Sequence, residues 1–384
     1  MKEGKPIQGK ERLEWVDSVR GLAIFGIFMV NVPAFNAPFF LYGGGEEYFP
    51  SATSDVVRAM IDIFFQASFY TLFSLMFGFG LQMMKDRLVQ KGIGYEAVLR
   101  RRLFVLFLFG VFHAFVIWHG DILLTYSVLG ALLLLFMKQK DRTLLAWAYG
   151  LLLAVTVPFT LLLYAARDYG LGYINRDKIE AAMMNYGNGS LPEIWSQNIA
   201  DWWYTNSPGN WPFLIMSMLP MMLFGMYIAR KRWLHEPDRH EATLWKWWSV
   251  TGFLFLLFKL GPYFFGTPAW FDMAQDNIGG SASAVFYVIT VTLLYKNRGK
   301  ALIRPLRWVG RMSLSNYIFQ SVVSFTAFYQ VGLGWYGDVT PLQSVLFVFV
   351  VFSAQVIISK WWLTRYRFGP LEWVWRTATY GRKV

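Results

Sequence analysis

The segment RRRLFVLFLFGVFHAFVIWHGDILLTYSVLGALLLLFMKQK, residues 100–140, decides the fold of this chain. It starts with three arginines, runs through an apolar stretch at 103–118, turns within a few residues and returns through a second apolar stretch at 122–137. Lysines follow the second stretch, whereas the turn holds no lysine or arginine. Because an apolar helix of about 20 residues can cross a bilayer, the segment predicts a helical hairpin in a membrane, basic on one side only.

Ten such apolar stretches divide the 384 residues. The chain is 55% hydrophobic and only 16% charged, whereas a soluble domain carries about 25% charged residues. We therefore expect an all-α, polytopic integral membrane protein, a bundle of about ten transmembrane helices. The predicted spans are 22–41, 61–81, 103–118, 122–137, 144–164, 212–229, 244–265, 282–295, 313–333 and 342–363.

The basic residues give the bundle an orientation. Thirty-one of the 36 lysines and arginines lie in alternate gaps between the apolar stretches, or just inside the stretch that borders such a gap (Lys246 and Lys360), beginning with the segment before the first stretch. The remaining gaps hold Arg58, Arg167, Arg176 and Lys178, and Lys259 lies inside a stretch. Cytoplasmic loops of membrane proteins carry the excess of Lys and Arg. The pattern predicts that both termini are cytoplasmic and that the hairpin turn after residue 118 faces the other side.

Composition excludes several classes of function. The chain has no cysteine, which rules out disulfides, thiolate nucleophiles and cysteine-ligated metal centres. The net charge of +12 is interpreted as the topology signal of the loops, so we expect contact with the lipid bilayer and no nucleic-acid binding. We divide the chain into a five-helix half (1–165), an extracytoplasmic loop that is either a lid or a surface helix (166–210), and a second five-helix half (211–384).

Ionisable side chains inside membrane spans are costly and are functional candidates for that reason. His113 lies within a span, and His119 and Asp121 follow in the hairpin turn. An imidazole oriented by a carboxylate is the simplest general base; a hydrogen bond that merely closes the hairpin is the alternative, and a metal site on the two histidines is a third. Other polar residues in or near spans are Asn31, Asp62, Gln66 and Lys259. Lys259 either snorkels to the interface or turns inward toward Asp62.

The basic gaps also have two interpretations. Arg101 and Arg102 before the third span, and Arg311 before the ninth, fit ordinary topology signals. They also fit a site for a polyphosphate such as coenzyme A, since arginine binds phosphate through two parallel hydrogen bonds.

Four local motifs together resemble one family. They are LEWVDSVRG (13–21) with Asp17 and Arg20, leading to Asn31; FYTLFSLMFGFG (69–80); the run from Arg101 through His113 and Asp121 to Tyr126; and GRMSLSNYIFQS (310–321) with Asn316 and Gln320, followed by FGPLEWVWR (368–376). Nearly the whole chain is similar to the YeiB-like, DUF418-containing bacterial membrane proteins. The resemblance implies a multi-pass protein of the bacterial cytoplasmic membrane and favours His113 over His119, which has no place in the family pattern.

More distantly, the chain is similar to membrane acyltransferases of the acyltransferase-3 and heparan-glucosaminide acetyltransferase type. Their Asp-x-x-Arg-Gly start matches Asp17 to Gly21. That resemblance implies an acyl-CoA donor at the cytoplasmic face and a lipid or glycan acceptor on the other side. The histidine that those enzymes carry near the first or second span has no counterpart, because neither span of this chain holds one.

Three functions follow from these observations. The first is an acyltransferase that binds acyl-CoA at Arg101, Arg102 and Arg311 and uses His113 with Asp121 as its base; no other cofactor is indicated. The second is a small-molecule or proton-coupled transporter that uses Asp62, Lys259 and His113. The third is a non-catalytic membrane protein of the cell envelope. No pattern in the sequence indicates a substrate or an oligomeric state.

Overall fold

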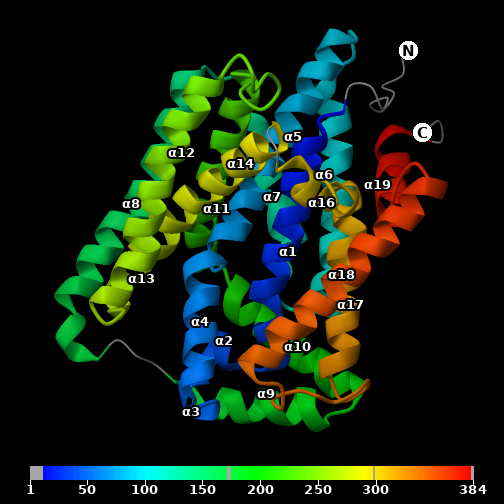
Figure 1. Cartoon of the computed structure of the whole chain (residues 1–384). Coiled ribbons are helices and arrows are strands. Elements are labelled where there is room, and N and C mark those ends of the chain that lie inside the picture. Colours follow the sequence, from blue (N-terminus) through cyan, green and yellow to red (C-terminus); the bar gives the residue numbers. More distant parts are fainter. Residues whose placement is uncertain (1–11, 171–173, 297–298, 382–384) are drawn as a thin grey trace.

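The computed structural model describes residues 12–170, 174–296 and 299–381, and these ranges contain helices and no strand. Each of the ten predicted stretches falls on a helical segment (Figure 1). In chain order these are α1 (Glu14–Asn36), α4 (Ala52–Phe64) with α5 (Ser68–Gln90), α6 (Tyr95–Phe112), α7 (Leu123–Leu133), α8 (Asp141–Ala165), α11 (Trp211–Arg230), α12 (Glu241–Phe255), α13 (Asp272–Ala274) with α14 (Gly280–Lys296), α17 (Ser313–Phe328) and α18 (Pro341–Arg365).

The structure shows an all-α, polytopic membrane protein. Six helical segments of the described chain are long and apolar enough to cross a bilayer, and 123–136 forms a shorter apolar helix. The other predicted spans are shorter helices, or helices that continue as a π-helical turn, so their number of crossings stays a prediction. The six segments are Glu14–Asn36, Ala52–Gln90, Asp141–Ala165, Trp211–Arg230, Ala269–Lys296 and Pro341–Arg365.

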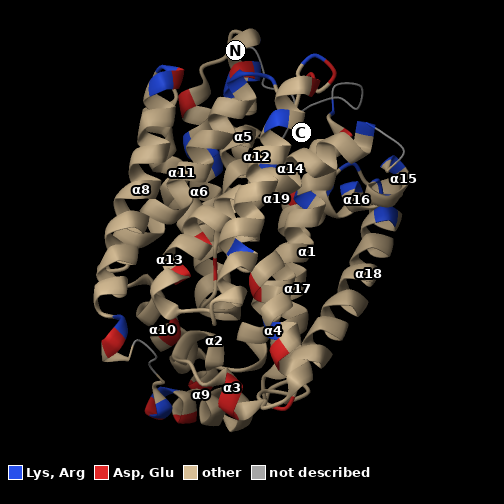
Figure 2. Cartoon of the chain, turned by 60° about the vertical axis from the view of Figure 1, so that its left-hand side comes forward, with Lys and Arg blue, Asp and Glu red and all other residues tan. Residues whose placement is uncertain are grey.

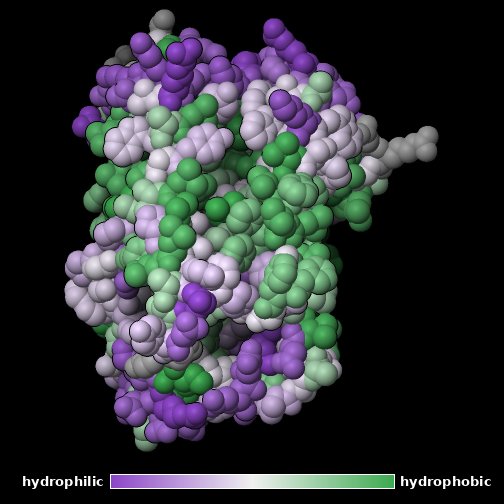
Figure 3. Space-filling view, turned by 90° about the vertical axis from the view of Figure 1, so that its left-hand side faces the viewer, coloured by the Kyte–Doolittle hydropathy of each residue, from purple (hydrophilic) through white to green (hydrophobic). Residues whose placement is uncertain are grey.

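The two ends of the bundle differ in charge. Lys and Arg gather at the end where α1 begins and α19 (Pro370–Tyr380) ends, and we call this the basic end (Figure 2). At the opposite end α9 (Arg176–Asn188) and α10 (Leu191–Asn206) lie across the bundle, and we call it the capped end (Figure 1). A belt of apolar side chains separates the two (Figure 3). This is the surface expected of a membrane-embedded bundle, with a polar region on each side of the hydrocarbon layer.

Helix α1 lies at the centre and positions the basic end. It packs against α14, α17, α18 and the short α16 (Leu306–Arg311). A Cβ atom at Gly21 would overlap the carbonyl oxygen of Leu306, and one at Gly310 would overlap that of Asp17. Because two glycines remove the side chains at this crossing, the backbones of α1 and α16 approach closely. The contact brings Asp17 and Arg20 next to Arg311.

The two halves expected at 1–165 and 211–384 interlock. Helix α1 packs on helices of the second half, and α5 packs along α11 over much of its length. Gly78 of α5 and Gly225 of α11 sit where a Cβ would overlap the partner backbone. The division into halves stays a prediction, and the described residues of 166–210 include α9 and α10 of the capped end.

Cysteine labelling tests the predicted orientation, because the chain has no cysteine of its own. Gln90 at the basic end and Glu180 on α9 are both exposed. We expect an impermeant maleimide to label Glu180→Cys in intact spheroplasts and to reach Gln90→Cys only after permeabilisation. The opposite result would invert the orientation, and labelling of both in intact spheroplasts would contradict a membrane between them.

Candidate functional site

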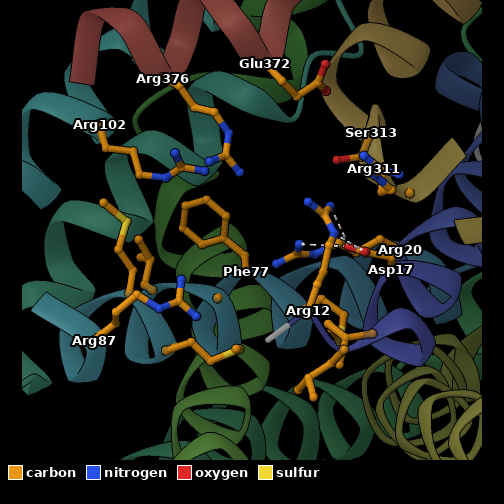
Figure 4. A pocket seen from close by; sticks show the side chains of 18 of the residues that line it. Arg12, Asp17, Arg20, Phe77, Arg87, Arg102, Arg311, Ser313, Glu372 and Arg376 are labelled. Carbon is orange, nitrogen blue, oxygen red and sulfur yellow. Dashed lines mark hydrogen bonds and ion pairs between the residues drawn. The ribbon is translucent and has the colours of Figure 1, made fainter. Parts of the chain in front are cut away.

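A cavity of about 220 Å³ opens among the helices at the basic end (Figure 4). Its wall comes from α1, α5, α6, α16 and α19 and from the start of α17. Arginine side chains from several of these helices point into the space around Phe77 (Figure 4). The charged residues that line it are Arg12, Asp17, Arg20, Arg87, Lys91, Arg102, Arg311, Glu372 and Arg376.

The cavity holds a large excess of positive charge. Six arginines and one lysine line it against two carboxylates, Asp17 and Glu372. Asp17 is 3% exposed, pairs with Arg12 and lies 3.8 Å from Arg20 Nη1. Burial, and after it the charge of Arg12, lowers the pKa of Arg376 to about 10. Positive charges that share one small cavity repel one another. The cavity is therefore suited to a ligand that carries several negative charges.

Glu372 uses its carboxylate to join two helices. Its Oε1 accepts hydrogen bonds from the backbone N–H groups of Leu314 (2.7 Å) and Ser315 (3.1 Å), and its Oε2 accepts one from Ser315 Oγ (2.5 Å). The donors form the first turn of α17, where a negative charge is favourable. A side chain at Gly369 would overlap Glu372 Oε2. The Gly-Pro-Leu-Glu sequence at 369–372 thus fixes α19 against the start of α17 and closes one wall of the cavity.

A second, narrow pocket continues from the cavity into the bundle. It has a volume of about 40 Å³ and a mainly apolar lining that includes Leu106, Ile122, Leu123 and Tyr126. It shares four lining residues with the cavity: Phe73, Phe77, Ser313 and Trp375. Its lining also includes Tyr317, whose ring centroid lies 4.9 Å from that of His113. Tyr317 therefore lies between the narrow pocket and the buried histidine.

His113 and Asp121 form a buried pair. His113 begins a π-helical turn, His113–Ile117, that continues α6, and Asp121 precedes α7. Their atoms Nδ1 and Oδ1 lie 2.8 Å apart, and both side chains are 0% exposed. Asp121 Oδ2 accepts the backbone N–H of Leu124 at 2.6 Å, which fixes the carboxylate. His113 Nε2 lies 2.8 Å from Ser321 Oγ of α17, so both ring nitrogens have partners. The sequence prediction did not single out Ser321.

The remaining predicted residues are distributed over the fold. Arg102 and Arg311 line the cavity with Asp17 and Arg20, but Arg101 is exposed and is not among the described lining residues. Adjacent helical residues point about 100° apart, so Arg101 and Arg102 face different surroundings. Binding of a phosphate by Arg101 therefore stays a prediction, and its side chain lies outside the described lining of the cavity.

Three further predicted residues are structural neighbours of the site. The hydroxyl of Tyr126 donates to the carbonyl of Tyr70 at 2.7 Å, and its ring lines the narrow pocket. Asn316 and Gln320 join α17 to α18, through Ser359 at 3.0 Å and Gln355 at 2.8 Å.

Asn31 and Gln66 lie outside the two cavities. Both are partly exposed, on α1 and in the break between α4 and α5. Neither residue is among those that line the described pockets.

His119 belongs to another cluster. Its Nδ1 lies 3.4 Å from Tyr186 Oη and 3.8 Å from Asp201 Oδ2, on the helices of the capped end. Asp201 also accepts the hydroxyl proton of Tyr42 at 2.6 Å. Burial lowers the pKa of His119, and Asp201 opposes that effect. His113 and His119 thus have different partners, and His119 joins the hairpin turn to the helices of the capped end.

Lys259 points inward and forms a third polar cluster. It is 0% exposed, and its Nζ lies 3.4 Å from Asp62 Oδ1 and 3.0 Å from Asp276 Oδ1. Asp62 Oδ2 also accepts from Tyr263 Oη (2.8 Å) and Gln275 Nε2 (2.5 Å). The sequence left open whether Lys259 snorkels to the interface or turns inward toward Asp62. It gave no sign of Asp276, because the polar run at 275–277 precedes the expected span at 282–295. The helix in fact begins earlier, within Ala269–Lys296.

These features define a class: a polytopic helical membrane protein with an arginine-lined cavity at one end and buried polar clusters inside the bundle. Residues 228–382 match the family described as "Protein of unknown function (DUF418)". The uncharacterized protein YxaH of Bacillus subtilis (strain 168) is 37% identical over 396 residues, covering 98% of this chain and 96% of the relative. YeiB of Escherichia coli (strain K12) is 29% identical over 400 residues, covering 96% of each chain. The chain belongs to the YeiB-like DUF418 family.

Removal of the Glu372 carboxylate tests how α19 is held. We expect Glu372→Ala to lower the free energy of unfolding by about 1.5–3 kcal/mol, the range for a lost hydrogen bond to a charged group, and to lower the melting temperature in detergent. Glu180→Ala on the exposed face of α9 is the control and should melt like the unsubstituted protein. Equal melting temperatures for both variants would contradict this role of Glu372.

Proposed function

We propose that this protein is a membrane acyltransferase. An acyl-CoA binds in the arginine-lined cavity at the basic end, and His113, oriented by Asp121, activates the group that receives the acyl chain. The acceptor, a hydroxyl or amine of a lipid or glycan, approaches from the capped end. One observation carries the proposal: the cavity and the narrow pocket share four lining residues, and the pocket reaches Tyr317, which lies against His113.

The chemistry of the cavity fits such a donor in two parts. Coenzyme A carries a pyrophosphate and a further phosphate, and arginine binds phosphate oxygens in pairs. Arg102, Arg311 and Arg376 supply such groups from three separate helices. The narrow pocket is lined by Phe73, Phe77 and other apolar side chains, which suits the acyl end of the thioester. The charged cavity and the apolar pocket therefore follow each other in the same order as the phosphates and the acyl end of an acyl-CoA.

The buried pair fits the role of a general base. With Asp121 ionised, the proton of the neutral imidazole lies on Nδ1 and leaves the Nε2 lone pair available, as in other carboxylate-oriented histidines. Both side chains are 0% exposed, so a donor in the narrow pocket reaches Nε2 only when Tyr317 moves. Active sites commonly stay closed to water in this way and change conformation when the substrate binds.

Transfer activity tests the base. Purified protein in nanodiscs is supplied with acetyl-CoA carrying a labelled acetyl group and with extracted membrane lipids and glycans as acceptors. We expect His113→Ala to lower the rate of label transfer by about 10²–10⁴-fold, the usual worth of a general base, and Asp121→Asn to lower it as well. His119→Gln should retain transfer. Unchanged transfer by His113→Ala would remove His113 from the mechanism.

Binding of free coenzyme A tests the cavity independently of catalysis. Titration calorimetry at low salt should show the dissociation constant rising about tenfold or more for Arg102→Gln and for Arg311→Gln, since a lost charged hydrogen bond of about 1.5–3 kcal/mol has that effect. Arg101→Gln is the matched control, because Arg101 is exposed beside Arg102 and does not line the cavity. The same weakening by Arg101→Gln would contradict binding in the cavity.

A proton-coupled transporter is the second candidate, and the Lys259 cluster favours it. An ion pair buried among helices is a common feature of ion pathways, and both helices that carry it, at Leu256–Leu260 and Gln275–Gly279, contain π-helical turns, which are frequent at functional sites. Proteoliposomes with a trapped pH dye provide the test. Transport would be supported by a proton flux that occurs without a thioester and is abolished by Asp276→Asn. Absence of proton flux would contradict the transporter.

A further inference from the structure

We infer that Ser321 is the nucleophile of the reaction and that it carries the acyl group as an ester between the two ends of the bundle. The inference rests on the proposed acyltransferase function and adds a covalent intermediate to it. Nothing in the sequence motifs distinguishes Ser321 from the other serines of α17; the structure does.

The geometry is that of a serine, a histidine and a carboxylate in series. Asp121 Oδ1 lies 2.8 Å from His113 Nδ1, and His113 Nε2 lies 2.8 Å from Ser321 Oγ. Ser321 is 1% exposed and His113 is 0% exposed. The three residues come from the turn before α7, the π-helical turn after α6 and the middle of α17. A serine that donates to a carboxylate-oriented imidazole is the arrangement that activates a hydroxyl for acyl transfer on several unrelated folds.

The hydroxyl proton of Ser321 has two acceptors within reach. One is His113 Nε2 at 2.8 Å, and the other is the backbone carbonyl of Tyr317 one turn earlier, at 3.3 Å. A helical serine that needs only a structural partner can bond that carbonyl. Here the shorter contact is to the imidazole, which lies in position to take the proton as the oxygen forms a new bond.

One face of α17 leads from the cavity to this serine. Residues four apart on a helix lie on the same side, and Ser313, Tyr317 and Ser321 follow that spacing. Ser313 lines both the cavity and the narrow pocket, and Tyr317 lines the pocket. Ser321 is the next position on this face. Displacement of Tyr317 would therefore extend the pocket to Ser321 Oγ.

On the other side of His113 the capped end contributes polar groups. Asn198 of α10 donates its amide N–H to the carbonyl of Ala114 at 2.7 Å, within the π-helical turn. The Asn198 side chain also acts on His119, whose pKa it raises against the effect of burial, whereas the Nε1 of Trp118 is buried and has no hydrogen-bond partner among the described residues. Buried polar atoms are normally satisfied, so the indole N–H of Trp118 is suited to bind the hydroxyl or amine of an acceptor that enters between α10 and the turn.

An acyl-serine also resolves a problem of access. A donor with several phosphates enters at the basic end, whereas the proposed acceptor enters at the capped end. Both cannot occupy the narrow space around His113, where Tyr317 already contacts the imidazole. If Ser321 takes the acyl group first, the donor leaves before the acceptor arrives, and only the acyl group passes the middle of the bundle.

The reaction proceeds in two steps. Ser321 Oγ attacks the thioester carbonyl carbon and passes its proton to His113 Nε2; the carbon–sulfur bond breaks, and the thiolate leaves with that proton as free coenzyme A. The acceptor oxygen or nitrogen then attacks the carbonyl of the serine ester and passes its proton to His113 Nε2. The ester bond breaks, and Ser321 Oγ takes the proton back.

Trapping of the intermediate tests the inference. Protein in nanodiscs is incubated with labelled acetyl-CoA and no acceptor, denatured, digested and examined by mass spectrometry. We expect an acetyl ester on Ser321 and exchange of labelled coenzyme A into acetyl-CoA. Ser321→Ala should lose the label and the exchange. We expect Ser321→Cys to be acetylated as a thioester, which neutral hydroxylamine cleaves faster than the serine ester. Ser324→Ala is the matched control, since Ser324 is a buried serine of the same helix whose hydroxyl has no partner among the described residues.

The outcomes separate this inference from the proposed function. Transfer to an acceptor that persists in Ser321→Ala but is lost in His113→Ala would overturn the serine intermediate and keep the acyltransferase. Label found on another residue, or unchanged exchange in Ser321→Ala, would overturn it too. No transfer, exchange or label with the unsubstituted protein would overturn both.

Discussion

A polar group inside a membrane bundle must find a partner, because the hydrocarbon layer offers no water to hydrogen-bond it. This constraint organises the interior of the protein. His113 is satisfied at both ring nitrogens by Asp121 and Ser321, and Lys259 by two carboxylates. Each cluster joins helices that are distant in the sequence. The polar residues therefore specify how the helices pack as well as what chemistry is present.

At the basic end, by contrast, several positively charged side chains line one cavity together with two carboxylates, Asp17 and Glu372. The close crossing of α1 and α16, and the cap that Glu372 places on α17, hold arginines from several helices around one cavity. A fold that assembles like charges at a cost in repulsion is suited to a ligand that neutralises them. The path from the cavity through the narrow pocket to His113 is therefore first charged, then apolar, and finally polar and buried.

Much of the fold could be predicted from the sequence, because apolar length and the alternation of basic gaps are local properties. The predicted stretches fall on helices. The break between α4 and α5 was missed, since residues 65–67 are apolar or neutral and nothing in their composition marks a break. Helices α16 and α19 were missed as well, because they are short and lie outside the apolar stretches.

The candidate site, like the fold, could be predicted only in part from the sequence. The pairing of His113 with Asp121 could be predicted because only eight residues and one turn separate them. Ser321 could not, because it meets His113 from 208 residues away. Arg12 and Arg376 looked like ordinary topology signals, and only the packing of α19 against α6 and α17 shows that they share a cavity with Arg102.

The most direct test of the central claim, that the basic cavity leads to His113, is a cryo-electron microscopy structure with a non-hydrolysable thioether analogue of acetyl-CoA. We expect density for the phosphates beside Arg102, Arg311 and Arg376, density for the pantetheine arm between Phe73 and Trp375, and a Tyr317 side chain turned away from His113. An analogue bound outside the cavity, or bound within it while Tyr317 still separates the pocket from His113, would contradict the claim.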